Sequence, residues 1–424
     1  MTRPAAGFLV LGAAALIGAA RSAPAPIEPA SAPTVVVLVI EALRHDYPER
    51  GAAPNLMKMA AEGGRADRLT PVFPPNSLPS QAAIATGRHP SGSGVINNRF
   101  YDRRLQRKLE GEPEDFSTML LTEPIWVAAA RAKVPVAATN WMATAGQPGV
   151  RTTSVHEDGS DAQRIEELLG WIAERGPQAP RLMLVYLEGL DDVSHKRGPD
   201  AGETLRAVEG YDGFAGKVLD ALRRHRAPHA TLLLLGDHGM ATVSRCIYLK
   251  AFLRRRGFDA DPYSTGGSAN VYFHSAADAA RAREALRGES ALLQAYLPAE
   301  LPERFRYRQP DRIGDLILIG KPGTYFRDLG GESNPVGPAR IPGAHGFAPD
   351  DPSMAGTLFA WGRGIAAGSR WSKVQVVDVY RTVCALLGLE PATGAAGRSL
   401  ADLRPAARSS MNGAAPAAAV PGRK

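Results

Sequence analysis

Nearly uninterrupted apolar runs are the clearest pattern along the chain, and they lie at 34–40, 181–187 and 230–235. None of the three alternates apolar with polar residues, and Val, Ile or Leu dominates each. Such runs are typical of strands that are buried on both faces, as in parallel sheets. Weaker runs at 134–138 and 357–361 predict two further strands.

Segments with helical character separate these strands. They lie at 55–63, 80–86, 125–132, 162–175, 205–224, 276–287 and 377–387. Strands that alternate with helices imply an α/β fold, with a mostly parallel sheet and helices on both faces. In such sheets, ligands bind beyond the carboxyl ends of the strands. Glu41, Asp191 and Asp237 each follow one of the three main runs, so we expect them to meet at one edge.

Histidines accompany two of these acids. His195 is four residues after Asp191, so one helical turn brings both side chains to one ion. Asp237 and His238 are adjacent between glycines, where the chain can turn, and His345 also lies between small residues. Carboxylates and imidazoles together suit a pair of Zn²⁺ ions. The alternative interpretation is that these acids and histidines are ordinary surface or capping residues.

Ser77 begins a predicted helix that has Pro79 in its first turn. A hydroxyl beside two metal ions is a candidate nucleophile for attack on phosphorus, and a helix N-terminus favours an anion. A plain N-cap is the common alternative for a serine in this position.

Three motifs stand out in the first part of the chain: PVFPPNSLPSQ at 71–81, the following TG at 86–87, and GVINNRFYD at 94–102. These motifs resemble the nucleotide pyrophosphatase/phosphodiesterase family of the alkaline phosphatase superfamily. LPERFRY at 301–307 and VDVY at 377–380 are similar to further family segments. The resemblance implies an alkaline-phosphatase-like core and a hydrolase acting on phosphodiester or phosphoric anhydride bonds.

The resemblance also implies roles for individual residues. It assigns one metal to Asp191, His195 and His345, and a second metal to Glu41, Asp237 and His238 with the Ser77 oxygen beside it. It makes Ser77 the nucleophile of a covalent mechanism and Asn98 a donor to a non-bridging phosphate oxygen. Leu78 then lies at the substrate pocket.

Several positions depart from the family pattern. Ser77 stands where the family usually has Thr, Glu41 where it has Asp, and Leu78 where an aromatic residue is usual. Residues 140–143 depart from a turn near the substrate pocket, and Ser-Gln at 80–81 replaces Asn-His. The changes at Leu78 and 140–143 weaken the expectation of a pocket that stacks a nucleotide base.

Other functions of the same superfamily remain open. A phosphomonoesterase or phosphonate hydrolase is one alternative, although no Lys or Arg is adjacent to Ser77 in the sequence to neutralise an extra phosphate charge. A sulfatase would need Arg at position 81, where this chain has Gln. A metal-stabilised binding protein without activity is the non-enzyme alternative.

The ends of the chain differ in composition from the middle. Residues 1–20 have the charged start, apolar stretch and small-residue cleavage site of a signal peptide, which predicts a secreted or periplasmic protein. A Pro/Ala linker at 21–33 would lead to a catalytic domain at 34–403 with an insert at roughly 242–342. The tail at 404–424 is rich in Ala, Pro and Ser and is expected to be disordered.

Charge and cysteine content exclude some partners. Removing Arg3 and the four cations of the tail from the formal charge of +7 leaves +2, so no nucleic-acid-binding patch is expected. Cys246 and Cys384 are too few for a disulfide framework. No later apolar run is long enough to span a membrane.

We expect a small phosphodiester substrate, either a nucleotide or a lipid head group. Nothing in the sequence indicates the oligomeric state.

Overall fold

The computed structural model describes residues 32–153, 160–330 and 333–403. The predicted signal peptide and tail lie outside the described residues, as does nearly all of the predicted linker. Within the described ranges, no helix is both long and apolar enough to cross a membrane.

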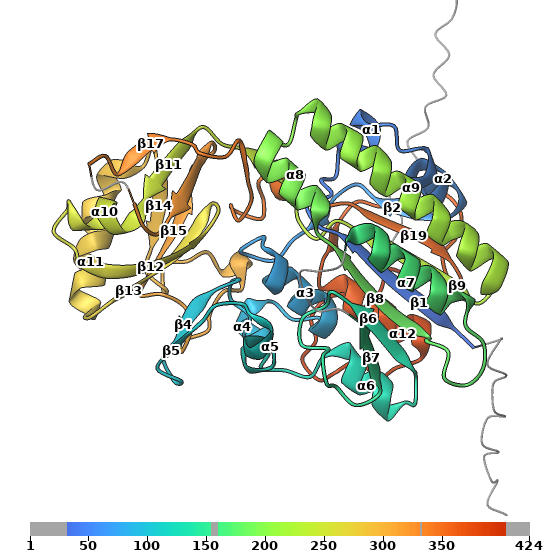
Figure 1. Cartoon of the computed structure of the whole chain (residues 1–424). Coiled ribbons are helices and arrows are strands. Elements are labelled where there is room, and N and C mark those ends of the chain that lie inside the picture. Colours follow the sequence, from blue (N-terminus) through green and yellow to red (C-terminus); the bar gives the residue numbers. More distant parts are fainter. Residues whose placement is uncertain (1–31, 154–159, 331–332, 404–424) are drawn as a thin grey trace, which may run out of the picture.

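An eight-stranded sheet forms the centre of the larger part of the molecule (Figure 1). Its strand order is β20-β2-β19-β9-β1-β8-β6-β7. The strands from β9 to β7 are parallel, whereas β19 is antiparallel to both of its neighbours. The strand bounds are β1 Thr34–Ile40, β2 Gly64–Ala66, β6 Val136–Thr139, β7 Val150–Thr153, β8 Leu182–Leu187, β9 Ala230–Leu235, β19 Leu358–Gly362 and β20 Ser369–Trp371. The predicted strands and the mostly parallel sheet are confirmed.

Helices cover both faces of this sheet, because alternate residues of each central strand enter different hydrophobic cores. In β1, Val35, Val37 and Val39 belong to one core, and the intervening residues belong to the other. One face packs against α2 Pro54–Glu62, α7 Asp161–Ala173 and α9 Gly202–His225. The other face packs against α3 Ser77–Thr86, α6 Ile125–Arg131 and α12 Asp378–Leu387. These six helices correspond to predicted ones.

A smaller lobe is inserted between two short strands, β10 Ala241–Thr242 and β18 Gly343–Ala344, which pair with each other (Figure 1). It contains a sheet of order β12-β13-β15-β14, a sheet of order β16-β11-β17, and two α-helices. Their bounds are β11 Arg245–Tyr248, α10 Leu249–Arg254, β12 Ala260–Thr265, β13 Ser268–Phe273, α11 Ala276–Ala285, β14 Leu293–Tyr296, β15 Leu316–Gly320, β16 Thr324–Arg327 and β17 Val336–Pro338. Among these elements, α11 corresponds to the helix predicted at 276–287.

Short elements complete the chain: α1 Tyr47–Arg50, β3 Leu69–Thr70, α4 Pro90–Ser93, β4 Phe100–Asp102, β5 Arg107–Leu109, α5 Pro113–Met119, α8 Gly189–Arg197 and β21 Val374–Gln375. Arg312 joins the small lobe to this part of the molecule. Its buried guanidinium donates to Asp102 at 2.8 Å and to three backbone carbonyls. Cys246 and Cys384 are both buried and both free.

Candidate active site

Three acidic residues meet beyond the carboxyl ends of β1, β8 and β9. These strands are neighbours because β1 pairs with β8 on one side and β9 on the other. Glu41 directly follows β1, Asp237 follows β9 after one glycine, and Asp191 lies in the first turn of α8, after β8. Glu41 and Asp237 are buried, and the side chain of Asp191 is 13% exposed. The structure therefore places the three acids at one edge of the sheet, as expected.

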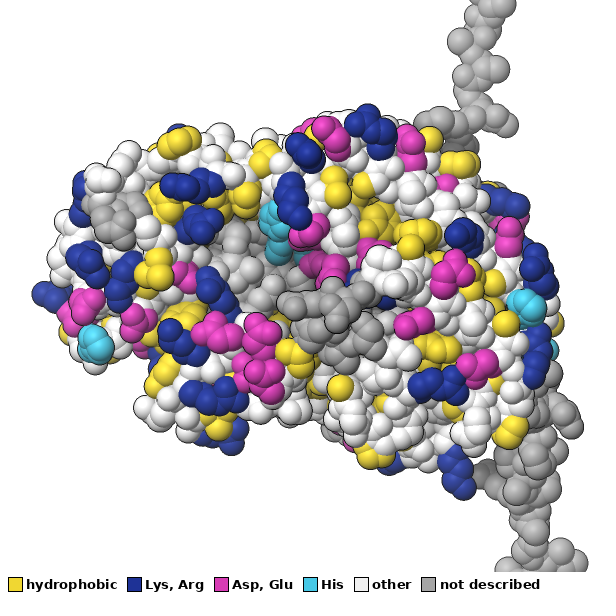
Figure 2. All heavy atoms as spheres, viewed as in Figure 1, with side chains coloured by type: hydrophobic (Ala, Val, Ile, Leu, Met, Phe, Trp, Pro, Cys, Tyr) yellow, Lys and Arg dark blue, Asp and Glu magenta, His cyan; other side chains and the backbone are white. Residues whose placement is uncertain are grey.

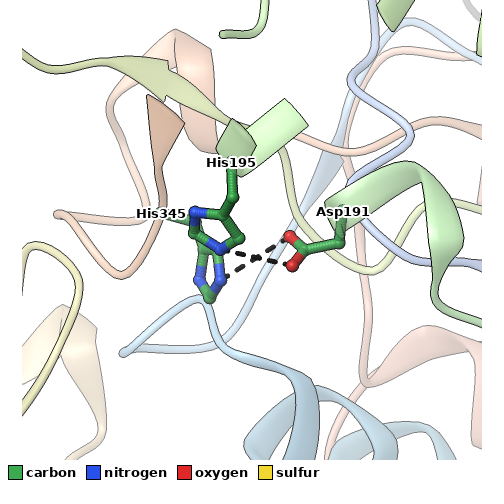
Figure 3. A group of neighbouring side chains, drawn as sticks. All are labelled: Asp191, His195 and His345. Atoms are coloured by element: carbon green, nitrogen blue, oxygen red, sulfur yellow. Dashed lines mark ion pairs between the residues drawn. The ribbon is translucent and has the colours of Figure 1, made fainter. Parts of the chain in front are cut away.

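Asp191, His195 and His345 form the first group of candidate metal ligands (Figure 3). His195 Nε2 lies 3.2 Å from Asp191 Oδ2, and His345 Nε2 lies 3.7 Å from Asp191 Oδ1. The helical spacing predicted for Asp191 and His195 is the observed one, since both lie on α8. One oxygen or nitrogen of each residue lies within 4.8 Å of the others.

A second group adjoins the first and shares Asp191 with it. Glu41, Asp191 and His238 bring donor atoms within 4.8 Å of one another. Asp237 lies beside this group, with Oδ2 3.7 Å from His238 Nε2. The same Oδ2 accepts a hydrogen bond of 2.9 Å from the hydroxyl of Tyr186. The family resemblance assigned Asp237 to this group, but the sequence did not indicate that Asp191 faces both groups or that Tyr186 takes part.

All three histidines are oriented by a backbone carbonyl. The Nδ1 atoms of His195, His238 and His345 lie 2.8, 3.0 and 2.9 Å from carbonyl oxygens of residues 343, 239 and 75. A carbonyl can only accept, so each Nδ1 carries a proton, and the Nε2 atom of each ring is turned towards the carboxylates. This arrangement is typical of histidines that ligate metals.

Two buried polar atoms without partners indicate that a cation can bind at this position. Asp191 Oδ1 and His238 Nε2 have no hydrogen-bond partner among the described residues. Buried polar groups normally find a partner, and an acceptor atom that faces other acceptors needs a positive charge. The donor set of carboxylate oxygens and imidazole nitrogens therefore fits divalent cations such as zinc.

The acids and histidines of the site strongly shift one another's pKa values. Burial, together with the Asp191 carboxylate, raises the pKa of Glu41 to about 8. Burial opposes the charge on Asp191, but His345 and other nearby imidazoles lower its pKa to about 2. Burial also opposes a charge on His238, whereas Asp237 and Glu41 raise its pKa to about 10. Burial and the neighbouring His238 lower the pKa of His345 to about 3. Closely packed buried carboxylates thus compete for positive charge.

Ser77 is the first residue of α3 and contacts the second group directly. Its Oγ donates a short hydrogen bond to Glu41 Oε1. The N-cap position is occupied by Asn76, so the alternative that Ser77 is a plain N-cap is wrong. Asn76 instead links the helix start to the first group, because its Oδ1 lies 2.8 Å from His345 Nδ1. The hydroxyl is therefore held at the boundary of the candidate metal site.

A cavity of about 400 Å³ opens above Ser77. Asn98 lies on its wall, and its Oδ1 accepts a hydrogen bond of 3.0 Å from the backbone N–H of Leu78. This bond fixes the amide and leaves its Nδ2 group, which has no hydrogen bond among the described residues, available to a ligand. Ser77, Leu78 and Asn98 thus lie together. The other lining residues are Glu41, Gln81, Glu110, Gly111, Phe116, Asn140, Trp141, Met142, Tyr186 and Glu188.

Comparison with known proteins identifies the family. A family model described as type I phosphodiesterase / nucleotide pyrophosphatase matches residues 35–348. The chain belongs to this family. An uncharacterized pyrophosphatase/phosphodiesterase of Schizosaccharomyces pombe is 27% identical over 379 residues, which cover 84% of this chain and 77% of that protein.

Animal relatives are longer than this chain. Human ectonucleotide pyrophosphatase/phosphodiesterase family member 1 is 25% identical, and the match covers 85% of this chain but 40% of the human protein. Venom phosphodiesterase 2 of Crotalus adamanteus is 24% identical, with 84% of this chain and 46% of the venom protein covered. The chain thus spans less than half the length of these two phosphodiesterases.

Solved structures of the same family share the fold. Murine ectonucleotide pyrophosphatase/phosphodiesterase 5 superposes with a TM-score of 0.77 at 22% identity, covering 87% of this chain and 99% of the murine chain. An inactive form of that protein in complex with AMP gives a TM-score of 0.76 at 22% identity. The match covers 85% of this chain and 96% of the murine chain. The alkaline-phosphatase-like α/β fold expected from the motifs is confirmed.

Gln81, which the sequence marked only as a departure from the family pattern, and Arg44, which it did not mark at all, hold this site together. Gln81 Oε1 accepts the backbone N–H of Met142 at 2.9 Å, so it positions the turn at 140–143. Arg44 is buried and donates to the carbonyl of Met240 at 3.0 Å, which ties the loop after β1 to the loop after β9. No sequence pattern marks these contacts, because each joins segments far apart in the chain.

Proposed function

We propose that this chain is a secreted or periplasmic, metal-dependent phosphodiesterase/nucleotide pyrophosphatase. It hydrolyses phosphodiester or pyrophosphate bonds through a covalent intermediate on Ser77. The observation that carries the proposal is the position of Ser77, whose Oγ contacts Glu41 at the boundary of the ligand groups and lines the 400 Å³ cavity. Secretion is supported by the composition of residues 1–20 and by the similarity to a venom phosphodiesterase.

Two divalent cations, expected to be zinc, would occupy the site. One would be held by Asp191, His195 and His345, and the other by Glu41, Asp237 and His238. When bound, such ions neutralise the charge of a phosphate group and favour ionisation of a nearby hydroxyl. The nitrogen and oxygen donors favour zinc, although the donor types alone also accommodate other divalent metals.

The protein's own residues carry the remaining steps. Ser77 Oγ attacks phosphorus, and a new Oγ–P bond forms as the P–O bond to the leaving group breaks. The amide of Asn98 donates to a non-bridging oxygen, where negative charge accumulates in the transition state. Water then hydrolyses the Ser77 ester and releases the second product.

The charges of the cavity favour diesters over monoesters. Among the described residues that line it, none is Lys or Arg, and Asn98 is neutral. A monoester dianion carries one more negative charge than a diester and would need an additional cationic partner.

A substrate panel on purified protein of measured metal content tests this function. The probes are bis(p-nitrophenyl) phosphate, p-nitrophenyl phosphate, and the p-nitrophenyl ester of thymidine 5′-monophosphate. We expect faster turnover of the two diesters than of the monoester, and loss of all turnover after chelation. A preference for the monoester would instead favour a phosphomonoesterase, and absence of turnover in metal-loaded protein would favour a binding protein.

A further inference from the structure

A second cavity, of about 380 Å³, flanks the candidate metal site on the side of His195. The small lobe supplies most of its wall, from β12, β16 and the segment that precedes β18. Asn98 and Arg99 are adjacent in the chain, yet Asn98 lines the first cavity and Arg99 the second. The two cavities therefore lie on either side of the same loop. In Figure 2, basic side chains lie beside the hollow on the small-lobe side.

The position of Ser77 gives the two cavities different roles. In an in-line displacement, the leaving oxygen departs on the side opposite the nucleophile. Ser77 contacts Glu41 of the second ligand group, so a leaving oxygen opposite Ser77 would lie on the side of the first group. His195 belongs to that group and also lines the second cavity. A leaving group on that side would face the second cavity.

The two cavities differ in charge. The described residues that line the first include three acids and neither Lys nor Arg. The second is lined by Arg99 and Arg327 and by one acid, Asp328. Asp328 is paired with Arg99 and also accepts the backbone N–H of Ser264 at 2.6 Å. Arg327 has no ion pair among the described residues, so it leaves a net positive charge at this cavity.

The Arg99–Asp328 pair also fixes the geometry of this wall. Arg99 precedes β4 in the main part of the molecule, whereas Asp328 directly follows β16 of the small lobe. Arg99 donates to Asp328 and lies within 3.4 Å of the carbonyl of Ser264. The pair therefore holds β16, and with it Arg327, against the loop that carries Asn98.

We propose that the second cavity is a subsite for leaving groups that carry phosphate, and that Arg327 is a specificity-determining residue. The inference rests on the proposed function and deepens it. As the Ser77 Oγ–P bond forms, the bridging P–O bond breaks and its electron pair leaves with the departing phosphate. A guanidinium pairs well with such an anion, whereas a neutral alcohol would gain nothing from it. The chain would therefore favour phosphoric anhydrides over diesters with uncharged leaving groups.

Equilibrium binding and turnover together test the subsite. The variant is Arg327→Gln, and the control is Arg304→Gln, because Arg304 lies in the same inserted stretch of the chain but lines neither cavity. Calorimetry measures binding of inorganic pyrophosphate to zinc-loaded protein. Kinetics compare a nucleoside triphosphate with the p-nitrophenyl ester of the corresponding monophosphate, which share the transferred group and differ in the leaving group.

We expect Arg327→Gln to weaken pyrophosphate binding by about tenfold and to lower kcat/KM for the triphosphate by a similar factor. The p-nitrophenyl ester should change by less than about twofold, and Arg304→Gln should change neither quantity. Unchanged pyrophosphate binding in Arg327→Gln overturns the subsite, even if the enzyme is active. Weakened binding in a protein that hydrolyses neither substrate supports the subsite and contradicts the proposed function.

Discussion

Glu41 keeps the carboxylate of the usual family aspartate, but its side chain is longer by one methylene. Its carboxylate contacts Ser77 and belongs to the second ligand group. We expect Glu41→Gln to lower kcat/KM by about 100-fold or more, because a neutral amide is a poor metal ligand. Glu41→Asp should retain substantial activity. Kinetics with parallel metal analysis measure both, and equal, near-normal rates in the two variants and in Glu41→Ala would remove residue 41 from the site.

A substitution at Asn98 can test the proposed contact with the phosphate without changing the fold. In Asn98→Asp, the carboxylate still accepts the N–H of Leu78, but the donor group is lost and a charge is added near the phosphate. Loss of one such donor typically costs about 10²–10³ in kcat. We expect a decrease of this order with an unchanged melting temperature. A variant with normal kcat would show that Asn98 does not touch the transition state.

The elements of the core were predictable because their apolar runs are long and continuous. β1 and β9 have the predicted bounds, and β8 begins one residue later than predicted. Continuous runs do not indicate which residues face which side, so the contact from Tyr186 to Asp237 could not be anticipated. In the small lobe, all of the described strands have six residues or fewer, and they lack clear patterning. The positions of these strands depend on pairing with distant parts of the chain, which the local sequence does not reveal.

Arg312 offers a test of how the small lobe is attached. Its side chain and that of Asp102 are each 1% exposed, and they form an ion pair. Arg312→Met would leave Asp102 and three backbone carbonyls without their donor, so we expect destabilisation of about 3–5 kcal/mol. Urea unfolding measures the change.

Arg304→Met provides the matched control for this experiment. Arg304 makes an exposed ion pair with Asp350, and such pairs contribute about 0–1 kcal/mol. A loss for Arg312→Met no larger than that for the control would contradict the bracing role of Arg312.

At the scale of the whole molecule, the site is assembled from segments that are distant in sequence. The motifs predicted which residue types gather, and the order of the parallel strands explains why Glu41, Asp191 and Asp237 converge. The sequence could not show that Asp191 faces both ligand groups. It also could not show that Arg44 ties two of the loops together, because tertiary packing alone creates these contacts.

Metal removal should destabilise the folded protein, because the buried acids compete for positive charge. Binding of a ligand to the native state alone stabilises it by about 2.7 kcal/mol at a free concentration of 100 times Kd. We therefore expect zinc-loaded protein to melt at a clearly higher temperature than the chelated protein in calorimetry. The difference should shrink in His195→Ala, which lacks one candidate ligand. Identical melting temperatures with and without metal would contradict a buried metal centre.

The covalent role of Ser77 is the central claim, and mass spectrometry of enzyme quenched during turnover tests it most directly. The account predicts a phosphoryl-type adduct on the peptide that contains Ser77. It also predicts that Ser77→Ala lowers kcat by several orders of magnitude while retaining fold and metal, and that Ser77→Thr remains active. Absence of an adduct in the wild-type enzyme, together with wild-type turnover in Ser77→Ala, would show that water attacks phosphorus directly.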